Sequence, residues 1–205
     1  MLWRTTDEAT ALRAKARPDA ARALAGTPPG AYILLRARSG GTGALSIRGS
    51  MNDLSELLTG DAVDEDLAAA NKKGLLHQLA LATSRRTGIP AKTIVAALAE
   101  RERIGSTGFG GGVAIPHAKI EGLERVFGYF ARLTVPIEFQ AVDGLPVDLV
   151  FLILSPPDAG AEHLKALAGV SRALRDRNTV AKLRGARSRD AIFALLAGIE
   201  RLNAA

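Results

Sequence analysis

Apolar residues recur at helical spacing in the middle of the chain. Between residues 71 and 87 they fall on one face and predict an amphipathic helix: Leu75, Leu76, Leu79 and Ala82. The tripeptide Gly88-Ile89-Pro90 is typical of a helix end followed by the start of another helix. We expect that second helix to continue to about Arg103.

Three later segments have the composition of β-strands: 113–116, 126–135 and 147–154. The last is almost continuously apolar, as expected of a strand that is covered on both faces. Pro156-Pro157-Asp158-Ala159-Gly160 then introduces a predicted helix over about 161–175, and shorter helical segments follow at 179–183 and 190–202. Helices before, between and after strands predict an α/β fold, a mixed β-sheet flanked by helices on both faces.

Residues 1–50 show no comparable periodicity. They are rich in Ala, Arg, Gly and Pro, and turn-forming runs such as Pro28-Pro29-Gly30 interrupt them. Their eight Lys or Arg and three Asp or Glu carry five of the six net positive charges of the chain. We therefore expect 1–50 to be a poorly structured or non-native extension and 51–205 to form the domain, beginning with a short helix that Asn52 or Asp53 caps.

Composition excludes several classes of function. The nearly neutral main domain gives no electrostatic case for binding nucleic acid or a membrane surface. The absence of cysteine rules out disulfides, thiolate metal sites and cysteine nucleophiles. The longest apolar run, Leu149–Leu154, is far too short to span a bilayer, and the first 30 residues contain no secretory signal. We expect a cytoplasmic protein without stable membrane insertion.

The strongest chemical signal is the stretch 105–118, in which glycines and hydroxyls lead through a short apolar segment to His117. Glycines let the backbone approach a bulky anion, hydroxyls add donors, and Pro116 fixes the chain before the histidine. A neutral imidazole is nucleophilic, and phosphohistidine is labile enough to pass its group onward. His117 is therefore the candidate phosphoryl acceptor. The candidate phosphate-binding residues of the loop are Ser106, Thr107, Gly110 and Gly111.

Two more residues are candidates for the same site. His163 falls in the first turns of its predicted helix, where the helix dipole and free N–H groups favour an anion. Arg101 lies at the margin of the buried face of its helix, whereas Arg103 points away. The alternative for either histidine is a purely structural residue, and for His77, on the polar face of its helix, that interpretation is favoured.

Other chemistries fit the sequence poorly, and we expect no metal or other cofactor. His117 and His163, with scattered carboxylates, lack the ligand spacing of a zinc site. Ser106 lacks the strand–turn–helix context of a hydrolase nucleophile. The Gly108–Gly112 run is neither followed by Lys-Ser/Thr nor preceded by a strand, as nucleotide-binding loops require.

Four motifs together resemble one known family: RERIGSTG at 101–108, GGGVAIPH at 110–117, PVDLVF at 146–151 and His163-Leu164. In their order and spacing, residues 51 to about 200 resemble enzyme IIA of the mannitol/fructose class of the bacterial phosphotransferase system. The resemblance is closest to its nitrogen-related branch (PtsN type). It implies a mixed sheet flanked by helices.

The resemblance also implies roles for the candidate residues. His117 would accept the phosphoryl group, through Nε2, from an HPr-like donor protein, with His163 and Arg101 near the phosphate. The family usually reads GIGNGIAIPHG where this chain has Phe109, Gly111 and Ala118. These changes keep the loop small and apolar and bear on the choice of partner rather than on the chemistry.

Two functions follow from the resemblance. In one, phosphorylation regulates binding to targets such as kinases or potassium transporters. In the other, the protein passes phosphate to a sugar-specific enzyme IIB. The sequence contains no enzyme IIB or membrane IIC segment, and we therefore expect the regulator. In both roles it is a phosphocarrier component of a phosphotransferase more than an enzyme with its own turnover.

Overall fold

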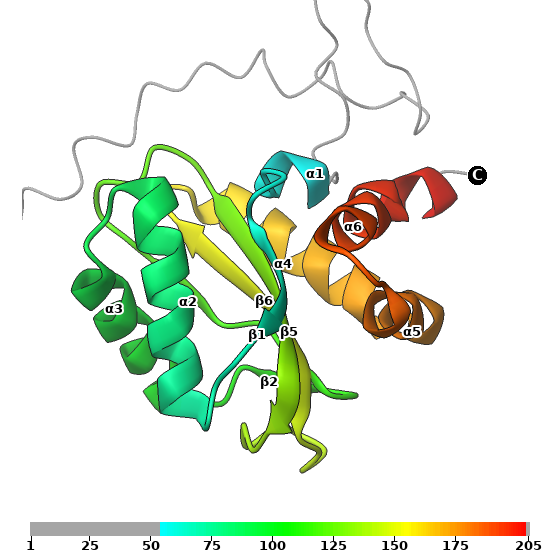
Figure 1. Ribbon diagram of the computed structural model, residues 1–205. Coiled ribbons are helices and arrows are strands. Elements are labelled where there is room, and N and C mark those ends of the chain that lie inside the picture. Colours follow the sequence, from blue (N-terminus) through cyan, green and yellow to red (C-terminus); the bar gives the residue numbers. More distant parts are fainter. Residues whose placement is uncertain (1–53, 204–205) are drawn as a thin grey trace, which may run out of the picture. The chain divides into compact units, whose positions relative to one another are not determined.

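The computed structural model describes residues 54–203, with no side-chain description at Ser55 or beyond 198. The expectations for 1–50, Asn52 and Asp53 lie outside the described residues. A mixed sheet lies between two layers of helices (Figure 1), as the sequence and the resemblance predicted. In chain order the elements are α1 (Leu54–Leu57), β1 (Val63–Leu67), α2 (Lys72–Thr87), α3 (Ala91–Ile104), β2 (Gly108–Gly110), β3 (Val113–Ala114), β4 (His117–Lys119), β5 (Phe127–Ile137), β6 (Val147–Ser155), α4 (Gly160–Arg175), α5 (Arg177–Gly185) and α6 (Arg189–Asn203).

Strand β6 is the centre of the sheet. It runs antiparallel to β5 on one side and parallel to β3 and then β4 on the other. Strand β1 extends the sheet beyond β5, and β2 pairs with β3. Every residue of β6 except Asp148 is buried, which confirms the prediction of a strand covered on both faces.

The segment predicted as a single strand over 113–116 is divided in the structure. Strand β3 ends at Ala114, and β4 begins at His117. Pro116 has no N–H to donate, but its carbonyl still accepts from the backbone N–H of Ile153 at 2.9 Å. His117 then pairs with Ile153 in register. The histidine is therefore anchored at the first residue of a short strand, against the most deeply buried strand of the sheet.

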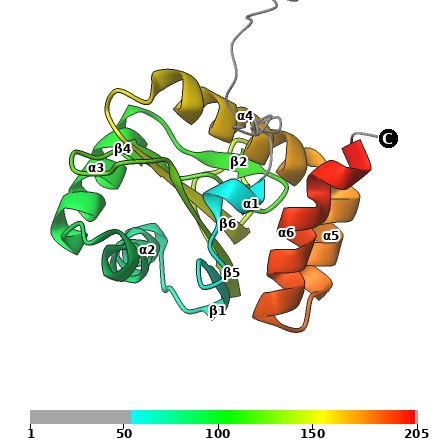
Figure 2. The same ribbon diagram turned by 90° about the horizontal axis from the view of Figure 1, so that it is seen from above.

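Helices α2 and α3 cover one face of the sheet, and α4, α5 and α6 cover the other (Figure 2). The side chain of Asn71 caps α2 by accepting from the N–H of Gly74 at 2.9 Å. Gly88 ends α2 in the left-handed conformation, at φ 72°. Both helices therefore begin and end close to the predicted positions. None of the described helices is long and apolar enough to cross a membrane.

Candidate functional site

His117 presents one ring nitrogen to the backbone and the other to an arginine. Its Nδ1 lies 2.8 Å from the carbonyl oxygen of Ile115. A carbonyl oxygen only accepts hydrogen bonds, so the proton of the neutral ring resides on Nδ1. Nε2 keeps its lone pair and accepts from Nε of Arg101 at 3.0 Å. The nucleophilic nitrogen of this ring is therefore Nε2.

The surroundings of His117 keep the ring neutral. Burial lowers its pKa from the ordinary value of 6.5, and the positive charge of Arg101 lowers it further. The Ile115 carbonyl and the Glu102 carboxylate act in the opposite direction without reversing the shift. At pH 7 the imidazole is therefore mostly uncharged and available as a nucleophile.

His163 lies beside His117 although the two belong to different elements. It is buried in the first turns of α4, and the centroids of the two rings are 5.5 Å apart. Its Nδ1 lies 2.6 Å from Oγ of Ser155, the last residue of β6. Burial lowers the pKa of His163, and electrostatic interaction with His117, Lys119 and Arg101 lowers it further. This ring too is neutral at pH 7.

Arg101 is oriented by its own helix end. It lies in the last turn of α3, where Nη1 donates to the carbonyl of Gly105 at 2.9 Å. Arg103 instead pairs with Glu100 and is exposed, as the helical spacing predicted. The structure thus brings together Arg101, His117 and His163 from α3, β4 and α4. Exposed His77 takes no part in this cluster.

The candidate phosphate-binding residues divide between two hollows. Ser106 and Thr107 line a cleft of about 370 Å³ together with His117. Gly110 and Gly111 line a neighbouring cleft of about 630 Å³, which shares Phe109 and Arg175 with the first. Of the four candidates, only Ser106 and Thr107 therefore border the cleft that contains His117.

Several donors of this loop already have protein partners. The N–H and Oγ1 of Thr107 both donate to the carboxylate of Glu102, at 2.9 and 2.6 Å. Ser106 Oγ donates to the carbonyl of Phe139 at 3.1 Å, and the N–H of Gly111 donates to Asp143 at 2.7 Å. Phosphate binding by these residues stays a prediction, and it requires them to exchange a protein acceptor for the phosphate.

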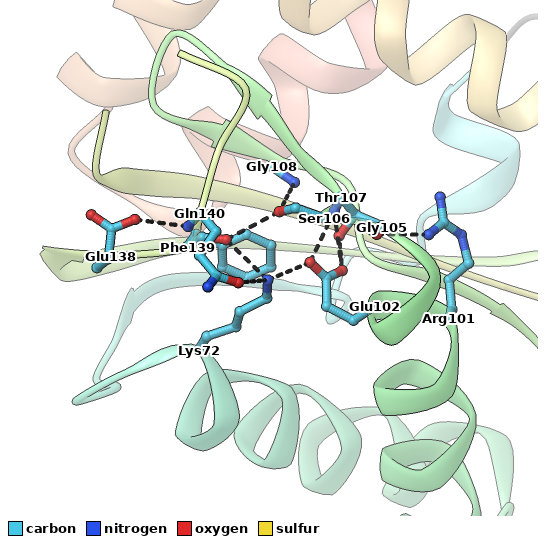
Figure 3. Close-up of polar contacts among 10 residues, drawn as sticks. All are labelled: Lys72, Arg101, Glu102, Gly105, Ser106, Thr107, Gly108, Glu138, Phe139 and Gln140. Atoms are coloured by element: carbon cyan, nitrogen blue, oxygen red, sulfur yellow. Dashed lines mark hydrogen bonds and ion pairs between the residues drawn. The ribbon is translucent and has the colours of Figure 1, made fainter. Parts of the chain in front are cut away.

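Glu102 is the centre of a polar network that fixes the loop (Figure 3). Lys72 Nζ lies 2.6 Å from the carboxylate and 3.0 Å from the carbonyl of Phe139. The network therefore joins α2, the end of α3 and the loop. Burial acts to raise the pKa of Glu102, but hydrogen bonds from Lys72 and Thr107 outweigh it, and the net pKa is lowered.

Two glycines are required by close approach. A Cβ on Gly108 would lie 2.6 Å from Cα of Ala141, so the two backbones meet there. Gly112 has φ +81°, and a Cβ on it would collide with the guanidinium of Arg184. Arg184 in turn bonds to Asp148 and to the carbonyl of Gly111. The loop is thereby held against α5.

Sequence reasoning missed Ser155 and the role of Glu102. Ser155 is a polar residue at the end of the apolar run of β6, directly before the double proline, and this position is the signal that could have identified it. Glu102 lies between Arg101 and Arg103, and the sequence pattern indicated a role for Arg101 alone. Within residues 54–203, no group of three or more His, Asp or Glu side chains is arranged to hold a metal ion.

Known proteins of similar sequence include nitrogen regulatory proteins. One from Bradyrhizobium diazoefficiens is 46% identical over 144 residues, which cover 70% of this chain and 94% of that protein. One from Escherichia coli is 34% identical over 148 residues, covering 72% of this chain and 91% of its own length.

Solved structures of enzyme IIA proteins are also similar to this chain. The nitrogen regulatory protein IIA-Ntr from Neisseria meningitidis superposes with a TM-score of 0.67 at 32% identity, covering 70% of this chain and 98% of that one. IIA mannitol from Escherichia coli shares the fold, with a TM-score of 0.58 at 21% identity over 68% of this chain and 99% of its own.

Residues 56–198 match the family described as phosphoenolpyruvate-dependent sugar phosphotransferase system, EIIA 2. The chain belongs to this family, and the nitrogen-related resemblance of its motifs is confirmed.

Proposed function

We propose that this protein is a phosphocarrier that accepts a phosphoryl group on Nε2 of His117 from a phosphorylated HPr-like protein. The observation that carries the proposal is the ring geometry. Nδ1 holds the proton against the carbonyl of Ile115, and Nε2 keeps its lone pair in a cleft. Membership in a phosphotransfer family supports the same chemistry.

The transfer exchanges one P–N bond for another. The Nε2 lone pair bonds to phosphorus as the bond between phosphorus and the donor's imidazole breaks, and that bonding pair leaves with the donor's ring. No proton has to leave Nε2, because it carries none. The positive charge that the His117 ring acquires is shared with the Nδ1–H group, whose hydrogen bond to the Ile115 carbonyl becomes charge-assisted.

Arg101 and His163 would stabilise the group in transfer. Negative charge spreads over the equatorial oxygens of the phosphoryl group, and preorganised donors lower the energy of that state with little covalent work. The guanidinium of Arg101 already lies at Nε2, and the His163 ring is 5.5 Å from the His117 ring. Both groups are therefore close enough to contact an oxygen of a phosphoryl group on Nε2.

Labelling tests this proposal directly. An HPr-like protein charged with radioactive phosphate should label the wild-type chain once, with an acid-labile, base-stable adduct. His117→Ala should take up none, and exposed His77→Ala should be labelled like the wild type. Label that persists in His117→Ala would overturn the assignment.

We further propose a regulatory use for this phosphorylation in the cytoplasm, with targets such as kinases or potassium transport proteins. Support comes from the relatives at 46% and 34% identity, which are named nitrogen regulatory proteins. A phosphoryl group carries about −1.5 to −2 charges at pH 7, of which the positive charge of the phosphorylated ring offsets a part. A target that docks over His117 should therefore discriminate between the two states.

A second candidate function is passage of the group to a sugar-specific enzyme IIB. It is favoured by a 32% identical relative, a fructose-specific EIIA component from Haloferax volcanii that aligns over 73% of this chain. The two candidates can be separated by measurement. A target whose affinity differs between unphosphorylated and phosphorylated protein supports the regulator. Equal affinities, together with rapid transfer to an enzyme IIB, support the carrier.

A further inference from the structure

Ser155 and His163 form a buried pair that the proposed reaction does not yet use. Ser155 is fully buried at the end of β6, and its Oγ lies 2.6 Å from Nδ1 of His163. Within the described part of the chain this hydroxyl makes no other hydrogen bond. The pair spans Pro156-Pro157, which lead from the sheet into α4.

The direction of this hydrogen bond follows from the surroundings of the hydroxyl. If Nδ1 of His163 carried the proton, Ser155 Oγ would accept it, and the hydroxyl's own hydrogen would be buried without an acceptor. An orphaned buried donor costs free energy and is rare in proteins. If Ser155 donates to Nδ1 instead, its hydrogen is satisfied. The second arrangement is the favourable one.

We infer that Ser155 is a positioning residue that holds His163 in the tautomer with the proton on Nε2. His163 Nε2 has no hydrogen-bond partner among the described residues, and none of their fully buried side-chain N or O atoms lacks one. Nε2 of His163 therefore reaches solvent. In the inferred tautomer it is an N–H donor beside the ring of His117.

This arrangement gives the two site histidines opposite roles. The Ile115 carbonyl fixes the proton of His117 on Nδ1, which leaves a nucleophilic Nε2. The Ser155 hydroxyl fixes the proton of His163 on Nε2, which provides a donor for an oxygen of the arriving phosphoryl group. The inference deepens the proposed function and rests on it for the identity of the phosphoryl acceptor. The tautomer of His163 does not depend on the proposed function, because it follows from the hydrogen bond to Ser155 alone.

Nitrogen NMR of the full chain, at a pH where both rings are neutral, identifies the protonated nitrogen. In the wild type, His163 should show a protonated Nε2 and an Nδ1 whose chemical shift is that of a hydrogen-bonded lone pair. In Ser155→Ala the Nδ1 shift should move to the value of an unbonded lone pair. A wild-type His163 with its proton on Nδ1 would overturn the inference.

A matched pair of variants separates the hydroxyl from side-chain shape. Ser155→Thr keeps the hydroxyl, whereas Ser155→Val has the shape of threonine without it. Phosphoryl acceptance from a charged HPr-like protein should be about five- to tenfold slower in the alanine and valine variants, the effect of one hydrogen bond. The threonine variant should recover both the rate and the Nδ1 shift. If the larger side chains prevent folding, the comparison of serine with alanine decides.

Equal rates in wild type and Ser155→Ala would refute the positioning role. Failure of the proposed function has a different signature. In that case the wild type itself would not be labelled on His117, while the NMR spectra would still report the tautomer of His163.

Discussion

Arg101 donates from its Nε to the nucleophilic Nε2 of His117 across 3.0 Å. Before the reaction, the lone pair that would attack phosphorus therefore accepts a hydrogen bond from the positively charged guanidinium of Arg101. The arginine has to release it as phosphorus arrives, and its charge is then beside the phosphoryl oxygens. Arg101 would therefore orient the ring through this hydrogen bond before transfer, and its charge would stabilise the phosphoryl oxygens during transfer, after the bond is released.

Replacing Arg101 by alanine should slow phosphoryl acceptance by roughly ten- to a thousandfold, the range expected for loss of one preorganised donor. The pKa of His117 should rise in this variant, because the positive charge of Arg101 is, after burial, a cause of its lowering. Single-turnover labelling and NMR titration measure the two effects.

Arg103→Ala is the matched control, because this neighbouring arginine is exposed and pairs only with Glu100 among the described residues. It should accept phosphate at the wild-type rate. If both arginine variants reacted at that rate, the site would be built from other residues.

His163→Ala should also fold and accept phosphate, again roughly ten- to a thousandfold more slowly. In the proposed role His163 would supply a neutral donor rather than the nucleophile, so label should still appear on His117. Rates measured beside those of His77→Ala, an exposed histidine on α2, would isolate the effect of the site. An unchanged rate in His163→Ala would remove this residue from the mechanism.

Glu102→Ala should lower the free energy of unfolding by about 2–4 kcal/mol, because it removes the ion-pair partner of Lys72 and leaves both donors of Thr107 without their acceptor. Glu102→Gln keeps one acceptor oxygen and should lose less. Urea unfolding measures both. Glu100→Ala, two residues away and exposed, should leave the unfolding midpoint unchanged.

Acid should weaken both stability and acceptance. The folded-state pKa values of His117 and His163 lie below 6.5, so the unfolded chain binds more protons once the pH falls below that value. Stability should therefore decrease as the pH falls through 6.5 toward the lowered values. The lowered pKa of Glu102 adds a second loss at lower pH, starting near its ordinary 4.5.

Phosphoryl acceptance needs the neutral His117 ring, so its rate should decline in acid with a midpoint below pH 6.5, the ordinary pKa of histidine. Labelling rates and urea unfolding across the same pH series test both effects. A rate that already halves at pH 6.5 would show that the folded-state pKa of His117 is not lowered.

Removal of residues 1–50 should leave the melting temperature and the rate of phosphoryl acceptance unchanged. Their composition offers no core-forming pattern, and a nearly neutral domain gives their basic excess no acidic surface to bind. Calorimetry and labelling of a chain that starts at Met51 provide the test. A large loss of either property would show that the segment stabilises the domain.

The sequence predicted the elements with strong periodicity and missed those that depend on distant partners. Helix α2 was expected from its apolar spacing, α3 from the Gly88-Ile89-Pro90 boundary and α4 from the proline-rich segment before it, whereas strands β5 and β6 were expected from their apolar composition. Strand β1 was not, because three acidic residues lie between Val63 and Leu67 and only pairing with β5 makes the segment a strand. Strands β2 and β4 are three residues each, too short for a periodic signal.

The site shows the same limit. The proximity of His117, Arg101 and His163 followed from helical spacing and from the family motifs. The partners of the loop did not, because Asp143 lies 32 residues from Gly111 and Phe139 lies 33 from Ser106. A glycine-rich composition indicates where an anion could approach, but only the folded chain decides whether an internal carboxylate already occupies the donors.

The carbonyl of Ile115 bears on how long a phosphoryl group would remain transferable. With the proton held on Nδ1, the phosphorylated ring would leave phosphorus as neutral imidazole, a far better leaving group than the imidazolate that loss of this proton would require. A backbone oxygen two residues upstream would thereby keep the P–N linkage activated. Such a site is suited to relaying a group in either direction between donor and acceptor, rather than to storing it.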